Sequence, residues 1–176
     1  LNERFRKYHE PARDCLEAPN ATKSTERLKS MELVLTIEAS GIAIATLLGD
    51  LYDVPVVFAK KSETANSTDD KYVSQAYSFT HKRMNNVFIS KPYLSSTDKV
   101  LIVDDFLADG EAAHALIDLV HQAGGKVAGL GIAIEKGQQK GGGELRKEGY
   151  RVESIAIVET MDWKTQTIKF RDQPVL

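Results

Sequence analysis

Apolar residues along this chain are grouped in runs of strand length, and segments with helical spacing separate several of these runs. The strand-like runs are rich in Val, Ile and Leu, which is typical of strands that are buried on both faces. They cover residues 33–37, 54–59, 100–103, 127–134 and 150–158, with a shorter run at 167–170. Helical spacing follows at 42–51 and 114–121, and we expect a short helix from residue 144.

Three other segments have different patterns. Residues 72–80 and 87–89 alternate enough to predict an antiparallel pair of strands. Residues 62–71 are polar and rich in turn formers, which predicts a long loop of the kind that is either a functional lid or disordered. Residues 1–30 are charged and weakly patterned, and two prolines, Pro11 and Pro19, interrupt them.

The order of strands and helices predicts the fold class. Strands that alternate with helices indicate an α/β protein with a mostly parallel, twisted sheet and helices on both faces. A length of 176 residues suits a single domain. In open sheets of this kind, ligands bind outside the carboxyl ends of the strands.

Polar residues follow four of the predicted strands. They are Glu38-Ala39-Ser40-Gly41, Lys60-Lys61, Asp104-Asp105 and Glu135-Lys136. Because the carboxyl ends of parallel strands meet at one edge, we expect these groups to converge on one site. Acids, lysines and exposed backbone amides at a common edge suit a substrate with several phosphates and with ribose hydroxyls.

The segment around Asp104 carries the most specific of these signals. An aliphatic run ends in Asp104 and Asp105, and a turn of small residues around Gly110 leads into the next helix. Such a loop presents backbone N–H groups at the positive end of a helix, where a phosphate can bind, with the acids beside it. An α/β crossover whose acids only cap a helix is the alternative interpretation of this segment alone.

Composition narrows the range of functions. A formal net charge of -2 argues against a broad nucleic-acid surface, and no apolar stretch approaches the length of a membrane span. The single cysteine, Cys15, excludes an internal disulfide and a zinc site built from cysteines, so we expect the cytoplasm as the compartment. Four histidines, 9, 81, 114 and 121, lack metal-ligand spacing, and we expect surface roles for them.

Six motifs in order resemble the type I phosphoribosyltransferase family. The segment 104–112 resembles its phosphoribosyl pyrophosphate signature, and the other motifs resemble the bacterial xanthine phosphoribosyltransferases of that family. Those motifs cover 36–42, 54–61, 77–80, 131–136 and 149–154. The resemblance implies the type I phosphoribosyltransferase fold, with a small hood to which residues 1–30 would contribute, and residues 62–71 as a lid.

The resemblance also implies roles for individual residues around the phosphoribosyl group. Asp104 and Asp105 would be the catalytic acids, which hold the ribose hydroxyls directly or through Mg²⁺. The 5-phosphate loop would be Ala108, Asp109, Gly110, Glu111 and Ala112, and the pyrophosphate loop would be Glu38, Ala39, Ser40 and Gly41. Lys60 or Lys61 would neutralise the pyrophosphate.

On the side of the base, the resemblance implies that Lys136 faces the purine and that Phe106 packs near it. The xanthine branch commonly has Asn and Gln where this chain has Asp109 and Glu111. Two carboxylates beside a phosphate site repel the ligand unless only backbone amides bind it. Phosphate binding is therefore expected from the N–H groups of the loop.

Some residues receive a structural interpretation. The Gly141–Gly143 run predicts a flexible connector, because no phosphate-binding Lys-Ser pair follows it. Trp163, near a strand turn, is expected to pack against the protein and not to stack on a base.

The implied reaction is transfer of phosphoribosyl from phosphoribosyl pyrophosphate to xanthine, with Mg²⁺, in purine salvage. Two alternatives stay open: transfer to guanine, hypoxanthine or adenine, and a non-catalytic, purine-responsive regulator with the same fold. The implied partners are a purine base, phosphoribosyl pyrophosphate and a second copy of the chain, with no nucleic acid and no membrane.

Overall fold

The computed structural model describes residues 31–61, 70–78 and 83–172. The expected hood at 1–30, with Cys15, lies outside these ranges, and so do residues 62–69 of the expected lid. Within the described part of the chain, no helix is both long enough and apolar enough to span a bilayer.

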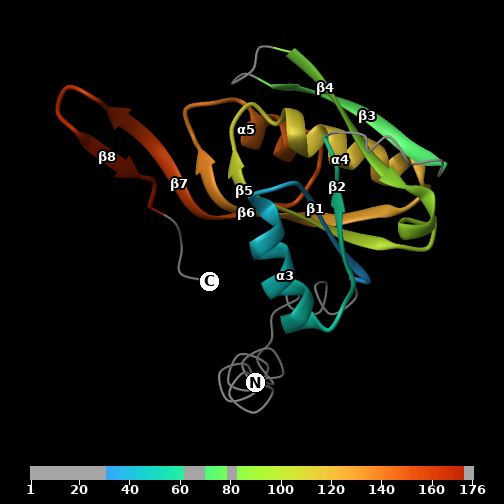
Figure 1. Cartoon of the computed structure of the whole chain (residues 1–176). Helices are drawn as coiled ribbons and strands as arrows, with labels where there is room; N and C mark the ends of the chain where they lie inside the picture. The colour runs from blue at the N-terminus through green and yellow to red at the C-terminus, as the bar shows by residue number, and fades with distance from the viewer. Residues whose placement is uncertain (1–30, 62–69, 79–82, 173–176) are drawn as a thin grey trace.

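A six-stranded sheet forms the centre of the molecule, in the order β2-β1-β5-β6-β7-β8 (Figure 1). Pairing is parallel from β2 to β7, and only β8 runs antiparallel to its neighbour. The bounds are β1 Leu33–Ile37, β2 Val56–Ala59, β5 Lys99–Leu107, β6 Lys126–Lys136, β7 Val152–Asp162 and β8 Thr167–Phe170. The predicted mostly parallel sheet is confirmed.

Helices cover both faces of this sheet, as the sequence predicted. Helix α3, Gly41–Tyr52, lies on one face, whereas α4, Glu111–Gln122, and α5, Gly141–Lys147, lie on the other (Figure 1). The predicted antiparallel pair is also confirmed: β3, Lys71–Ser78, pairs with β4, Arg83–Ser90, and the hairpin packs over α4. A 3₁₀ turn, Lys91–Tyr93, follows β4.

Strand β5 shows why its apolar run forms a buried strand. Successive side chains of a strand point to opposite faces, so a strand that is covered on both sides needs apolar residues at every position. Val100 and Ile102 pack into the cluster on the α4 face, whereas Leu101 and Val103 pack into the cluster on the α3 face. All four are nearly inaccessible to water, which anchors the strand that carries the two acids.

Two contacts fix the hairpin relative to the sheet. Lys60, directly after β2, exchanges both backbone hydrogen bonds with Phe88 of β4 at 3.0 Å. The side-chain amide of Gln122 donates to the Val73 carbonyl at 2.8 Å, and its oxygen accepts from the Val73 N–H at 3.3 Å. The end of α4 therefore holds β3 in place by imitating a neighbouring strand.

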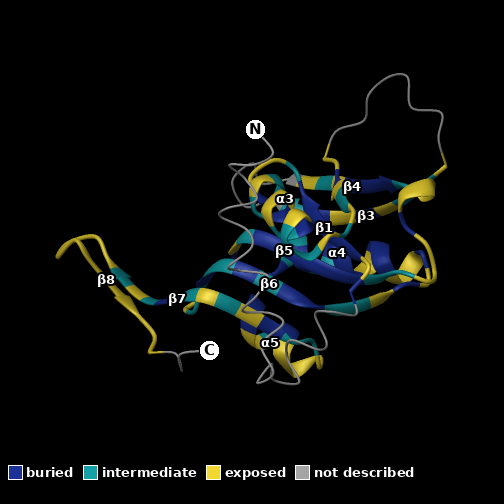
Figure 2. Cartoon of the chain, turned by 90° about the horizontal axis from the view of Figure 1, so that it is seen from below, coloured by how far each residue is buried: buried dark blue, intermediate teal, exposed yellow. Residues whose placement is uncertain are grey.

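Two sequence predictions about this part of the fold are wrong. The Gly141–Gly143 run is not a flexible connector but the first turn of α5, with Gly141 and Gly142 buried. Trp163 does not pack: it lies in the turn between β7 and β8, a hairpin that projects from the body, and it is 83% exposed (Figure 2).

Candidate active site

The carboxyl ends of β1, β2, β5 and β6 lie along one edge of the sheet, because these strands are parallel neighbours. Three of the four predicted polar groups meet at this edge. Asp104 lies in β5 beside Gly41 of the segment after β1, and the positive charge of Lys61, which follows β2, acts on the Asp104 carboxyl. The predicted convergence is therefore confirmed for these groups.

Asp104 is the most perturbed acid of this edge. It is 9% exposed, and its carboxyl Oδ1 accepts a hydrogen bond from the Asp105 N–H at 2.9 Å. Burial, together with the neighbouring Asp105, raises the pKa of Asp104 to about 7, although Lys61 acts in the opposite direction. A buried carboxyl that titrates near neutral pH is typical of a functional site. Asp105 is less buried than Asp104.

The segment 38–41 packs closely against these acids. Its Glu38 Oε1 accepts a hydrogen bond from the Lys61 N–H at 2.6 Å, which links the ends of β1 and β2. A Cβ atom at Gly41 would collide with the Thr36 hydroxyl and would lie 3.3 Å from Asp104 Oδ1. Gly41 is therefore required for packing at this corner.

The two lysines after β2 have different surroundings. Lys61 is exposed at the edge that holds Asp104, whereas Lys60 is held by its backbone pairing with Phe88 and lines a separate hollow beside Tyr93. Of the two, Lys61 is placed to act on a ligand at Asp104.

The loop 108–112 joins β5 to α4 and begins that helix. Gly110 adopts a φ of 90°, a left-handed conformation that favours glycine, and serves as the N-cap residue. The Gly141 N–H donates to the Ala108 carbonyl at 3.1 Å, and a Cβ atom at Gly141 would lie 2.5 Å from Gly110 N. The first turn of α5 thus supports the loop from behind.

A cleft of about 360 Å³ joins this loop to the end of β6. Asp104, Phe106 and Lys136 line it together with every residue of 108–112, so the predicted phosphate and base residues share one space. The Lys136 Nζ lies 5.7 Å from the centre of the Phe106 ring, which is a cation–π contact. Phe106 is 48% exposed, as suits a surface that receives a flat ligand.

Two residues of the cleft were not predicted as site residues. Tyr77 reaches the cleft from β3, and Gln139 reaches it from the turn after β6. The Gln139 Oε1 is buried and accepts no hydrogen bond from the described residues. Such an atom can accept from an N–H group of a ligand. Tyr77 lies in the 77–80 motif of the family resemblance, which was the signal that could have identified it, whereas Gln139 carries no sequence signal and is brought to the cleft by the fold.

Glu135 does not join the site, so the prediction for this acid is wrong. It is 4% exposed and forms two hydrogen bonds with the Arg146 guanidinium, at 2.8 and 2.7 Å. The Ser154 hydroxyl donates a third at 2.6 Å. These partners hold the pKa of Glu135 below its usual range, Arg146 contributing most. Its role is structural, and it ties β6 to β7 and α5.

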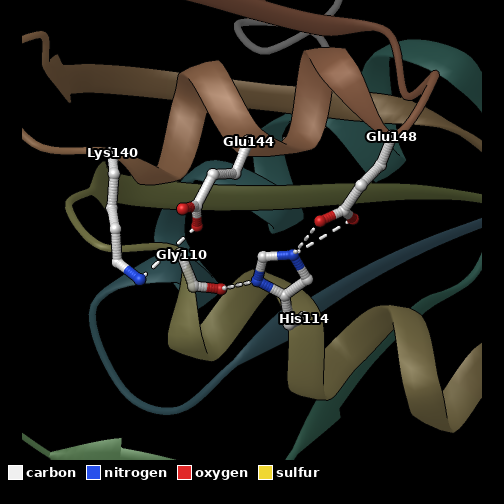
Figure 3. Close-up of polar contacts among 5 residues, drawn as sticks. All are labelled: Gly110, His114, Lys140, Glu144 and Glu148. Atoms are coloured by element: carbon white, nitrogen blue, oxygen red, sulfur yellow. Dashed lines mark hydrogen bonds and ion pairs between the residues drawn. The ribbon is translucent and has the colours of Figure 1, made fainter.

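His114 also differs from its predicted surface role. Its ring lies between α4 and α5, with Nδ1 2.9 Å from the Gly110 carbonyl and Nε2 3.2 Å from both carboxylate oxygens of Glu148 (Figure 3). His121, near the end of the same helix, is exposed as predicted. Histidines 9 and 81 lie outside the described residues.

Asp104 and Asp105 are the predicted metal ligands at this edge. Among residues 31–61, 70–78 and 83–172, no group of three or more His, Cys, Asp or Glu side chains is placed to hold a metal ion. A metal at Asp104 and Asp105 therefore needs further oxygen ligands from a substrate or from water.

The chain is similar to a known protein family and to several of its members. The model of the phosphoribosyl transferase domain matches residues 21–174. Xanthine phosphoribosyltransferase of Bifidobacterium adolescentis is 52% identical over 144 residues, which is 81% of this chain and 75% of that protein. Xanthine phosphoribosyltransferase 2 of Clostridium botulinum strain Langeland is 53% identical over 130 residues, 73% of this chain and 68% of that protein.

Solved structures show the same fold. The adenine phosphoribosyltransferase of Giardia lamblia, complexed with 9-deazaadenine, matches with a TM-score of 0.67 at 24% identity and covers 84% of each chain. The adenine phosphoribosyltransferase of Thermoanaerobacter pseudethanolicus matches with a TM-score of 0.64 at 22% identity, over 78% of this chain and 81% of that one. At these identities the likeness establishes the fold alone.

Proposed function

The chain belongs to the phosphoribosyltransferase family, and from this premise we propose that it transfers the 5-phosphoribosyl group of phosphoribosyl pyrophosphate to xanthine. The products are xanthosine monophosphate and pyrophosphate. Identity of about half to relatives named xanthine phosphoribosyltransferase favours xanthine over other purines.

One observation carries the proposal. A single cleft brings together a buried acid that titrates near neutral pH, a loop at the start of a helix, and a lysine stacked over an exposed phenylalanine. These three features correspond to the ribose, the 5-phosphate and the flat base of one nucleotide product. An ordinary α/β crossover, in which the acids only cap a helix or face water, would not require these three features to share one cleft.

In this reaction the bond between ribose C1′ and the pyrophosphate oxygen breaks, and its electron pair leaves with the pyrophosphate. An imidazole nitrogen of the purine supplies the electron pair of the new bond to C1′, and the imidazole proton is released to water or to the pyrophosphate. Positive charge develops on the ribose and negative charge on the leaving group, so fixed charges of the right sign stabilise the transition state more than the ground state.

We assign the charges at the ribose and pyrophosphate accordingly. Asp104 and Asp105 hold the ribose hydroxyls and face the developing positive charge. The loop 108–112 binds the 5-phosphate through its N–H groups, and residues 38–41 bind the pyrophosphate. Lys61 neutralises the leaving group, in keeping with its effect on Asp104, whereas Lys60 lines another hollow.

The carboxylates of Asp104 and Asp105 also suit Mg²⁺, which prefers oxygen ligands and keeps several waters. They would hold the ion indirectly, through the ribose hydroxyls or water. When bound, the ion supplies positive charge at the pyrophosphate oxygens. Asp104 retains a proton at lower pH because it is buried, so it offers a full negative charge only above neutral pH.

On the base side, Lys136 donates to a carbonyl oxygen or ring nitrogen of the purine, and Phe106 packs on the face of the purine. Gln139, whose side-chain oxygen has no hydrogen-bond partner among the described residues, adds an acceptor to the lining of the same cleft. Xanthine carries both carbonyl oxygens and N–H groups, so a site with both a donor and an acceptor matches it. Adenine has no carbonyl oxygen for Lys136 to bind.

The organisation around this core is part of the proposal. The chain acts as one domain, in which residues 1–30 contribute to a hood and the segment 62–71, whose last residue begins β3, closes over the reacting centre and excludes water. We further propose a homodimer in the cytoplasm, with no nucleic acid or membrane as partner. Light scattering after size-exclusion chromatography measures the oligomeric state.

The test of the function is direct. The protein is incubated with phosphoribosyl pyrophosphate, Mg²⁺ and each of xanthine, guanine, hypoxanthine and adenine, and nucleotide formation is followed by chromatography. Xanthosine monophosphate is expected as the fastest product. Product from adenine alone would contradict the xanthine assignment, and no product with any base, despite measurable binding of phosphoribosyl pyrophosphate, would favour the regulator.

A further inference from the structure

His114 occupies a position that the proposed reaction does not yet use. It lies one turn into α4, and its ring bridges the 5-phosphate loop and α5 (Figure 3). The Gly110 carbonyl receives two hydrogen bonds from this residue, one from the His114 N–H and one from the ring Nδ1, both at 2.9 Å. On the other side the Glu148 carboxylate lies 3.2 Å from Nε2.

Both contacts require a proton on the histidine side. A backbone carbonyl and a carboxylate are acceptors only, whereas a neutral imidazole has one N–H and one lone pair. With a neutral ring, one lone pair would face an oxygen of Gly110 or of Glu148 and repel it. Only the imidazolium, which donates from both nitrogens, satisfies the two contacts together.

The hydrogen bond to the Gly110 carbonyl can affect phosphate binding through a single peptide group. The carbonyl that accepts from Nδ1 belongs to the same peptide as the Glu111 N–H, which is the first amide of α4. A positive charge that polarises this carbonyl makes the N–H of the same peptide a better donor, since hydrogen bonds in a chain strengthen each other. The bond also holds Gly110 at its left-handed φ of 90°.

We propose that His114, as an imidazolium, is a positioning residue that holds the 5-phosphate loop in its binding shape and offsets the negative charge of Asp109 and Glu111. The affinity for phosphoribosyl pyrophosphate then falls as His114 loses its proton. This inference rests on the proposed function, because it assigns the phosphate of that substrate to the loop 108–112.

The segments around the ring, which are α4, the loop 108–112 and α5, carry several charged groups. Glu148 faces Nε2 from α5, and Lys140, directly before α5, is paired with Glu144 at 3.6 Å (Figure 3). The hairpin strand β3, which packs on α4, brings Tyr77 to the cleft. The acids of the three segments are Asp109, Glu111, Asp118, Glu144 and Glu148.

The decisive comparison is between His114→Gln and the wild-type protein, with kcat and the KM for phosphoribosyl pyrophosphate measured from pH 6 to pH 9. At pH 6 the variant should have a KM about five- to tenfold higher, with kcat within about twofold, since a charge-assisted contact is lost in binding and not in the chemical step. The KM ratio should approach one at pH 9. A ratio that stays constant across this range would overturn the proposal.

Two further variants sharpen the comparison. His121→Gln removes the exposed histidine of the same helix and should leave the KM and its pH dependence unchanged. Glu148→Gln removes the carboxylate beside Nε2, so the ring loses one of its two acceptors, and the KM at pH 6 should rise by less than in His114→Gln. Because the substrate phosphates and Asp104 titrate equally in all these proteins, the differences between variants report on His114.

A spectroscopic measurement separates this inference from the proposed function. Nitrogen-15 NMR of the imidazole groups in the full chain should show protons on both His114 nitrogens at pH 6. A neutral ring at that pH would overturn the inference even if the enzyme is active. If the ring is doubly protonated but the protein forms no nucleotide, the proposed function is contradicted, whereas the inference about the two contacts of His114 stands.

Discussion

Asp104 and Glu135 are buried acids on neighbouring strands, and the protein treats them in opposite ways. Asp104 is 9% exposed, and burial raises its pKa to about 7. Glu135 is 4% exposed, yet the Arg146 guanidinium and the Ser154 hydroxyl hold its pKa below its usual range. Burial dominates the pKa of Asp104, whereas the cationic partner Arg146 outweighs burial at Glu135.

The contrast shows how an acid that can bind a ligand differs from an acid with a structural role. The Glu135 carboxylate receives three hydrogen bonds from Arg146 and Ser154, so it has little left to offer a ligand. Asp104 accepts a hydrogen bond from the Asp105 N–H and lines the cleft. Burial of the Asp104 carboxylate destabilises the folded protein, and a bound substrate can supply the hydrogen-bond partners that it lacks. Such a destabilised group is typical of functional sites.

The largest expected effect is on activity. Asp104→Asn or Asp105→Asn should lower kcat/KM for phosphoribosyl pyrophosphate by about a hundredfold or more, because a charge aimed at the developing cation is lost. Glu135→Gln should keep kcat near that of the wild type in steady-state assays below its melting temperature. Equal losses in Asp104→Asn and Glu135→Gln would erase the distinction between the two acids.

The second effect is on stability, and its sign differs between the acids. The folded pKa of Asp104 lies above the unfolded value of 3.8, so the native state loses stability as the pH rises from about 4 to 7. Asp104→Asn should therefore be more stable than the wild type at pH 8, by roughly 2–4 kcal/mol at most, and equally stable near pH 4. Urea denaturation at the two pH values measures the difference.

Glu135 gives the opposite sign in the same experiment. Its folded pKa is below the usual 4.5, so its stabilisation is present above that pH and is lost as the pH falls through the folded pKa. Glu135→Gln should be less stable than the wild type at pH 8, and the gap should narrow under acid. A parallel pH dependence for both variants would contradict the opposite shifts.

The third effect isolates the partner of Glu135. Arg146→Met leaves a buried carboxylate without its cation and should cost roughly 2 kcal/mol, at the low end for broken buried pairs because Arg146 is partly exposed. Arg151→Met is the matched control, since Arg151 pairs with Glu153 at the surface at 2.9 Å and should change stability by less than about 0.5 kcal/mol. Thermal unfolding of both variants, followed by circular dichroism, measures the contrast.

The smallest effect is the pH profile of the reaction. If ionised Asp104 is the active form, kcat/KM should fall about fivefold between pH 7 and pH 6. The profile is best measured in His114→Gln, in which the other proposed titration is absent. A flat profile across this range would mean that the charge of Asp104 does not limit the reaction.

The sequence predicted most of the fold, because each apolar run is long enough to be read without tertiary information. It also predicted the place of Asp104 and Asp105, since acids at the end of a buried strand are unusual locally. It could not separate Glu135 from Asp104: the deciding partner, Arg146, is brought to Glu135 only by the packing of α5 against the sheet.

The other misses have the same origin. The ring of His114 gains its contacts from Glu148, which lies on another helix. The Gly141–Gly143 run looked like a connector because glycine disfavours helices, yet Gly141 and Gly142 are buried against Ala108 and Glu135, where no larger side chain fits. Helix propensity depends on local sequence only, and at these positions tertiary packing outweighs it.

These glycines also limit how the sequence can vary. A Cβ atom at Gly141 would press on the loop 108–110, and one at Gly142 would collide with the Glu135 carboxylate, whereas one at Gly143 would meet nothing within 4 Å. In evolutionary terms, three neighbouring positions with the same residue face three different kinds of selection. Substitution should be free at Gly143, while Gly141 and Gly142 are constrained by the loop 108–110 and by the ion pair of Glu135 with Arg146, to which they do not chemically contribute.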